Sequence, residues 1–168
     1  MMDAMMKAAT PSPMHAWLLE DVGHWTGSCT SWPSAAAEPM HTRADFVVEG
    51  KLGGRFVQTL HTSEMPEGID PFEGIALTGF DNAAGQFEST WIDCFGTAMM
   101  TGVGTRSADG RTLDMRSSYY CPIRRCRTPI RHTITRDSAN TQTHRMWSND
   151  FATGKEYLMM EAVYTRAK

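Results

Sequence analysis

The stretch GIALTGFDNAAGQFESTWID, residues 74–93, decides the fold class. It contains two short runs, Gly74–Phe80 and Phe87–Asp93, that are rich in β-branched and aromatic residues. Asp81-Asn82 and Gly85 lie between the two runs, and these residue types favour tight turns. The stretch therefore predicts two antiparallel strands joined by a short turn.

The same pattern of β-favouring runs separated by turn residues recurs on both sides of this stretch. Its turn signals include Gly53-Gly54, Asp109-Gly110 and Thr153-Gly154. The other predicted strands are Trp25–Ser31, Arg43–Val48, Arg55–Thr62, Thr97–Thr105, Thr112–Tyr120, Ile130–Thr135, Thr141–Trp147 and Glu156–Arg166. About ten short strands in succession indicate an antiparallel meander, and closing the meander into a barrel removes its two edges. We therefore predict an all-β, up-and-down barrel.

One short helix is predicted before the strands. Ser12 is a good N-cap and Pro13 suits the first helical position, while Gly23 ends the run. Apolar residues recur between them at helical spacing, at Met14, Trp17, Leu18 and Val22. We expect this helix to cap one end of a single lipocalin-like domain over residues 12–168, with a flexible segment at residues 1–11.

Composition excludes several classes of protein. The formal charge is −3, from 16 Lys and Arg against 19 Asp and Glu, and a nucleic-acid-binding surface needs a basic surplus instead. No apolar run suggests a signal peptide or a membrane-spanning helix, so we expect a cytoplasmic protein with reduced cysteines, no membrane partner and no bridge between Cys121 and Cys126. No HxH, HExxH or CxxC spacing occurs, so we expect no metal and no cofactor. The sequence does not decide between a monomer and a homodimer.

Six ordered motifs carry a family resemblance. They are Gly23-His-Trp25-Thr-Gly27, Leu52-Gly-Gly-Arg55-Phe, Phe72-Glu-Gly74, Gly79-Phe-Asp81, Trp91-Ile-Asp93 and Glu161-Ala-Val-Tyr164-Thr-Arg166. Together they are similar to a bacterial family of domains of unknown function, related to nitrobindin and the lipocalin-like calycin barrels, over His15 to Arg166. The resemblance implies that Trp25 plugs one end of the barrel and packs against Arg166, both in structural roles. It names no reaction.

Strand alternation indicates which polar groups face the interior. Phe87, Ser89, Trp91 and Asp93 share one face, and the aromatic rings mark that face as internal. For Arg55 we expect the double glycine before it to allow a bulge that turns its side chain inward. Arg55 and Asp93 then form either a structural ion pair or the polar end of a ligand site.

In the second case, the apolar body of the ligand rests on Trp91, Met99, Trp147 and Tyr164. Among the strand histidines His61, His132 and His144, we prefer His144 as a functional candidate, three residues before Trp147.

The segment from Arg116 to Arg136 carries six arginines and is either a solvated hairpin or a basic rim at the cavity mouth that attracts an anionic ligand.

Two functions remain. The first is binding of a small, largely hydrophobic molecule, aromatic or fatty and with or without an acidic end. The second is a cofactor-independent isomerase or lyase in which Asp93 or His144 moves a proton and Arg55 stabilises an oxyanion. A haem-binding role like that of nitrobindin is disfavoured because the last strand has no histidine to serve as axial ligand.

Overall fold

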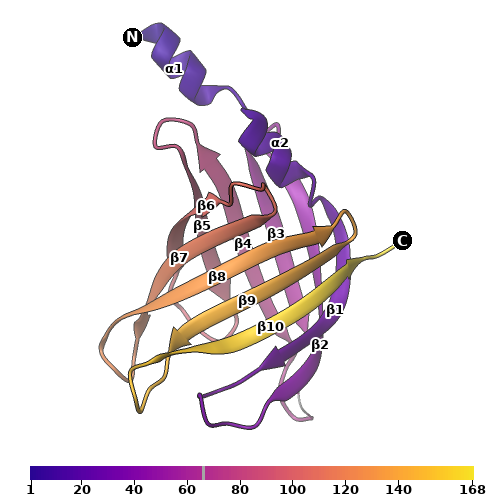
Figure 1. Cartoon of the computed structure of the whole chain (residues 1–168), viewed down its shortest axis with the longest axis vertical. Coiled ribbons are helices and arrows are strands. Elements are labelled where there is room, and N and C mark those ends of the chain that lie inside the picture. Colours follow the sequence, from indigo (N-terminus) through magenta and orange to yellow (C-terminus); the bar gives the residue numbers. More distant parts are fainter. Residues whose placement is uncertain (66) are drawn as a thin grey trace.

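A computed structural model describes residues 1–65 and 67–168, and it shows a closed antiparallel barrel preceded by two helices (Figure 1). Each strand pairs with its neighbours in the chain, and β1 pairs with β10 to close the barrel. The elements are α1 (Met2–Ala9), α2 (Pro13–Leu19), β1 (Gly23–Ser31), β2 (Met40–Lys51), β3 (Phe56–Ser63), β4 (Phe72–Asp81), β5 (Gln86–Asp93), β6 (Met100–Arg106), β7 (Thr112–Cys121), β8 (Cys126–Ser138), β9 (Thr141–Asn149) and β10 (Glu156–Arg166). The predicted fold class is confirmed.

Seven of the ten strand starts differ from the prediction, by one to four residues; β2, for example, begins at Met40 instead of Arg43. β6 begins at Met100 instead of Thr97, and β8 begins at Cys126 instead of Ile130. Pro129 made the earlier start of β8 hard to see, because proline lacks the N–H of a ladder bond. The pairing of β8 with β9 begins only at Ile130, so Pro129 has a partner strand on one side alone.

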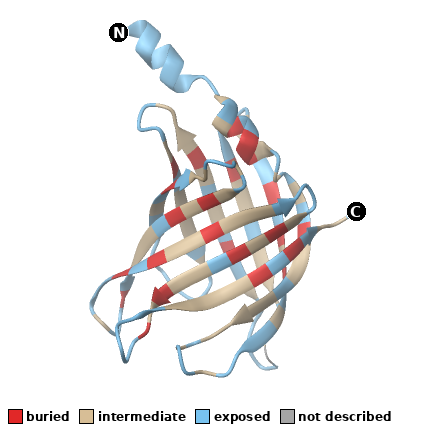
Figure 2. Ribbon diagram, in the orientation of Figure 1, coloured by how far each residue is buried: buried red, intermediate tan, exposed pale blue. Residues whose placement is uncertain are grey.

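The predicted helix is α2, which covers the end of the barrel where β1 begins and β10 finishes (Figure 1). Its Trp17 and Leu18 are buried against the internal side chains of that end, including Trp25 and Phe87. Buried residues cluster under the helix and along the strands in Figure 2. The main apolar core therefore fills the α2 end, which we call the closed end.

Two arginines fasten α2 to the barrel. The Arg166 guanidinium lies 4.3 Å from the centroid of the Trp25 ring, in the position that the resemblance implied, and donates to the carbonyls of Glu20 and Val22. The Arg136 guanidinium lies 3.7 Å from the centroid of the Trp17 ring and forms an ion pair with Asp21. Each cation thus joins the last strands to the helix or to the residues that follow it.

The segment expected to be flexible, residues 1–11, contains the second helix, α1. None of its residues is buried, so no core pattern marked it in the sequence. Its C-terminal end is held by side chains of two turns: Asn82 donates to the carbonyls of Ala8 and Thr10, and Arg55 donates to that of Ala9.

No helix among the described residues has the length and apolar character that crossing a membrane requires. The four cysteines are free thiols. Cys121 and Cys126 are paired residues across the β7–β8 hairpin, without a disulfide between them.

The substitution Arg166→Leu should lower the free energy of unfolding by about 2 kcal/mol or more, because it removes a cation–π contact and two hydrogen bonds to carbonyls. Urea denaturation measures the change. The control is Arg145→Leu, which breaks an exposed pair with Glu161 and should cost about 1 kcal/mol or less. Equal losses in the two variants would contradict the proposed role of Arg166.

Candidate functional site

Three histidines face the interior of the barrel, beyond the apolar core of the closed end. His61 on β3 is the pairing partner of buried Phe46, and His144 on β9 pairs with buried Ala162. His132 on β8 faces the same way, and its ring centroid lies 5.6 Å from that of His144. The neighbouring strands β8 and β9, and β3 from the opposite wall, therefore place three imidazole rings at one level of the barrel.

The tautomer of His144 is fixed from the closed end. The Gln142 side chain donates to Asp21 through Nε2, so its Oε1 is the acceptor toward His144 Nε2 at 3.0 Å. His144 Nε2 must therefore carry the proton, and Nδ1 is unprotonated. Burial lowers the pKa of His144 well below its ordinary value, and the nearby His132 and His61 act in the same direction.

His61 and His132 differ from His144 because neither makes a hydrogen bond among the described residues, and His132 Nε2 is a buried nitrogen without a partner. Desolvation lowers the pKa of His61 to about 3 and that of His132 to about 4, so both imidazoles are neutral at pH 7. Both nevertheless keep some accessible surface, whereas His144 is only 4% exposed. They therefore border interior space that side chains do not fill.

An aromatic wall adjoins His61. The Trp91 ring on β5 lies across Gly74 of β4, where an added Cβ would overlap the ring. The same ring stacks with Phe72, at 6.2 Å between centroids, and meets the edge of His61 at 5.3 Å. Glycine at position 74 is thus what allows Trp91 to lie along the wall of the barrel.

Asp93 lies on the same face as Trp91, at the end of the barrel away from α2, which we call the open end. Its Oδ2 accepts a hydrogen bond of 2.7 Å from Trp91 Nε1, and its Oδ1 accepts one of 2.9 Å from the backbone N–H of Phe95. The inward direction predicted for Asp93 agrees with this register, and the carboxylate is half-buried.

The inward direction predicted for Arg55 is wrong. Arg55 precedes β3 in a turn where Gly53 and Gly54 have positive φ, and its exposed side chain donates to the carbonyls of Leu52 and Ala9. The turn is at the α2 end of β3, whereas Asp93 is at the open end of β5. Arg55 and Asp93 therefore form neither an ion pair nor a shared site.

Two of the four residues predicted to support the ligand also lie outside the barrel. Trp147 pairs with Arg131 on the outer face, where the Arg131 guanidinium is 4.8 Å from the Trp147 ring centroid. Met99 is 63% exposed in the loop before β6, and Met100 is the residue that pairs with Trp91. Trp91 and Tyr164 do face inward, with Tyr164 packed edge-on to Phe46.

The six arginines between residues 116 and 136 do not form a continuous rim. Arg116 and Arg131 belong to the outer face, and Arg131 pairs there with Asp114. Arg136 is at the closed end. The other three, Arg124, Arg125 and Arg127, lie in or next to the β7–β8 hairpin at the open end, where Arg124 donates to the carbonyls of Asn149 and Asp150.

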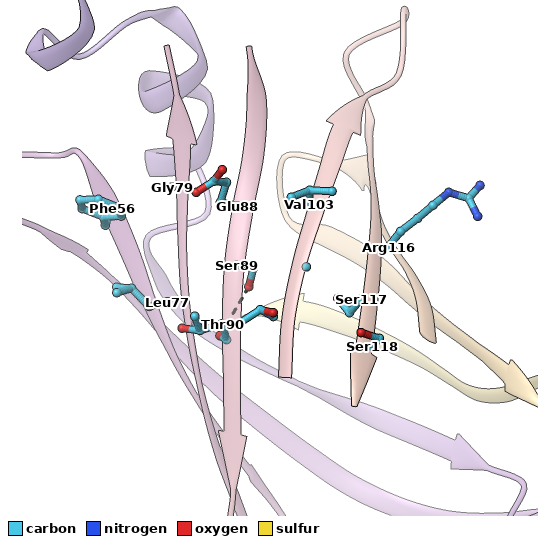
Figure 3. A pocket seen from close by; sticks show the side chains of 12 residues that line it. Phe56, Leu77, Gly79, Glu88, Ser89, Thr90, Val103, Arg116, Ser117 and Ser118 are labelled. Atoms are coloured by element: carbon cyan, nitrogen blue, oxygen red, sulfur yellow. Dashed lines mark hydrogen bonds between the residues drawn. The ribbon is translucent and has the colours of Figure 1, made fainter. Parts of the chain in front are cut away.

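A groove of about 550 Å³ lies on the outer surface, across β3 to β7 (Figure 3). Phe56, Leu77 and Val103 supply its apolar side chains, and Glu88 and Arg116 stand on either side of Val103. The groove contains no buried polar group without a partner among the described residues. The interior, which does contain one, is the stronger candidate site.

No group of three or more His, Cys, Asp or Glu side chains in residues 1–65 and 67–168 is arranged to hold a metal ion. The three internal histidines therefore do not converge on one point.

Residues 10–166 match the model of a family described as "Protein of unknown function (DUF1579)", and the chain belongs to that family. No curated protein matches the sequence.

Two solved structures have the same fold. The S-type phycobiliprotein lyase CPES from Guillardia theta has a TM-score of 0.68 and 10% identity, over 98% of this chain and 97% of the lyase chain. Rv2717c from M. tuberculosis has a TM-score of 0.68 and 14% identity, over 95% of this chain and 100% of its own. At these identities, the likeness shows the barrel fold alone.

Acid should destabilise the protein through the internal histidines. The folded-state pKa values of His61 and His132 are about 3 and about 4, below the value of 6.5 for a free side chain, so the unfolded chain binds more protons. The contribution of these histidines to the free energy of unfolding is therefore fully present above about pH 7. It falls by roughly 2 kcal/mol for each neutral histidine between pH 7 and pH 5. Urea midpoints across this range measure the slope.

Two variants assign the slope. His132→Phe should flatten it, whereas His41→Gln, at an exposed histidine of β2, should leave it unchanged. Burial raises the pKa of Asp21, and this carboxyl group therefore makes the protein more stable as the pH falls, opposite to the histidines. For this reason the slope of each variant is compared with that of the wild type. A His132→Phe profile as steep as that of the wild type would show that His132 does not stay neutral in the fold.

Proposed function

We propose that the barrel binds a small, largely apolar molecule in its interior, entered from the open end. The observation that carries the proposal is the pair of neutral imidazoles, His61 and His132, which lack partners among the described residues and border unfilled interior space. Apolar walls with a few polar groups of fixed position are typical of sites for small molecules.

The exposure of inward-facing residues changes along the barrel axis. At the closed end Trp25, Phe46 and Phe87 are at most 2% exposed. Toward the open end, Cys121, Thr128, Ile130 and Ser148 are still buried, but most other residues on the same face are only half-buried, although the strands remain paired. They include Trp91, Met100, His132, Met146 and Met160. This difference supports a closed end that is filled by side chains and a space for a ligand toward the open end.

The lining indicates the kind of ligand. Trp91 and Phe72 offer flat apolar surface, and methionine side chains adapt their shape to a bound molecule. A neutral imidazole can accept a hydrogen bond at one nitrogen and donate at the other, so it can serve a hydroxyl, carbonyl or amide group. The ligand we propose is therefore an aromatic or fatty molecule with few polar groups.

The isomerase or lyase alternative receives less support. It required Arg55 beside Asp93, and Arg55 lies outside the barrel at the opposite end. His144 is buried and already donates its proton to Gln142. Binding is thus the function that the arrangement of the interior supports best.

Binding can be tested with N-phenyl-1-naphthylamine, an uncharged aromatic dye that becomes fluorescent in apolar surroundings. We expect saturable binding by the wild type. Ala76 faces inward beside Trp91, so Ala76→Phe should fill the space and weaken dye binding at least about tenfold, or about 1.4 kcal/mol.

The matched control is Leu77→Phe, which places the same ring on the outer face next to the groove. This variant should bind the dye like the wild type. Circular dichroism and thermal unfolding check that both variants fold. If Leu77→Phe loses the dye and Ala76→Phe keeps it, the dye binds in the outer groove and the proposal is wrong.

A further inference from the structure

Asp93 is a half-buried carboxylate without an ion-pair partner among the residues that the structure describes. Its hydrogen bonds come from two neutral donors, the indole of Trp91 and the backbone N–H of Phe95. These donors fix the direction of the carboxylate and leave its negative charge in place. An ionised carboxylate on an internal face normally has a cation beside it.

The Trp91 indole that binds this carboxylate belongs to a row of three aromatic rings. The rings of Phe72 and Phe95 are 5.2 Å apart, and Phe72 also stacks with Trp91. The three rings come from β4, β5 and the loop that follows β5, and Asp93 lies between Trp91 and Phe95 in sequence. Ring faces attract cations, so the rings and the carboxylate favour the same charge.

The two loops next to Asp93 contain no lysine or arginine. The connection from β3 to β4, residues 64–71, contains Glu64, Glu67 and Asp70 and no lysine or arginine, and the loop from Cys94 to Met99 carries no charged residue. Arg43 near the start of β2 is on the outer face, where it pairs with Asp45. The other arginines of the open end belong to the β7–β8 hairpin, which is separated from β5 by β6. The charged residues of these two loops are therefore all acidic, which favours a cation beside Asp93.

We propose that Asp93, Phe72, Trp91 and Phe95 form a subsite for the cationic head of an amphiphilic ligand, such as a quaternary or protonated amine. The inference rests on the proposed function, since the apolar part of the same ligand would occupy the interior. An ammonium group next to Asp93 supplies the missing counter-charge and can contact the ring faces. A carboxylate head would meet a like charge there.

The structural alternative is that Asp93 only orients Trp91 through its hydrogen bond to the indole. In that case the charge of the carboxylate has no influence on which head group binds. The two roles are separable, because asparagine keeps an acceptor oxygen for the indole and loses the charge.

The experiment displaces N-phenyl-1-naphthylamine with three probes that share a ten-carbon chain: decyltrimethylammonium, decanol and decanoate. All three are used below their micellar concentrations. For the wild type we expect decyltrimethylammonium to compete at least about tenfold better than decanol, and decanoate to be the weakest. Asp93→Asn should reduce the advantage of the ammonium head about tenfold and leave the affinity for decanol unchanged.

Glu73→Gln is the matched control, because Glu73 is exposed on the outer face of β4, next to the register position of Asp93. This variant should keep the wild-type order of affinities. Equal affinity for the three probes, or a preference for decanoate, would overturn the cationic subsite while leaving interior binding intact. An absence of binding for the dye and for all three probes would instead contradict the proposed function itself.

Discussion

Two arginine–tryptophan stacks at the closed end are the interaction on which the rest of the structure depends. Arg136 covers Trp17 of α2, and Arg166 covers Trp25 of β1, so that the last strands of the barrel are tied to its first elements. Closure by β1 and β10, together with these two cations, therefore makes the sheet a barrel with one solid end.

The closed end also determines the state of the interior. Asp21 pairs with Arg136 and accepts a hydrogen bond from Gln142, which in turn fixes the tautomer of His144. Arg136 and Arg166 are thus held by Asp21 and by carbonyls of α2 and of the residues that follow it. Because desolvation holds the three imidazoles in the neutral form, the histidine layer contributes polar nitrogen atoms to the middle of the barrel without adding positive charge.

Alternation along the strands explains how much of the site the sequence could predict. It placed Trp91 and Asp93 inside because two aromatic rings shared their face, and the register confirms this direction. For Arg55 the prediction relied on a bulge at the double glycine, but Arg55 lies in the turn before β3, where strand alternation does not set its direction. Its direction there depends on contacts with Leu52 and on the carbonyl of Ala9, a residue far away in sequence.

Trp147 was misplaced for a different reason. Large aromatic residues on a strand usually mark the internal face, but Arg131 of the neighbouring strand offers Trp147 a cation–π partner on the outside. Phe72, by contrast, could have been found, since it is two residues before Gly74 and shares its face. What no single strand reveals is that Gly74 leaves room for the Trp91 ring, which brings Phe72 and Asp93 together. Sites of this kind arise between strands, so they follow from register more than from residue type.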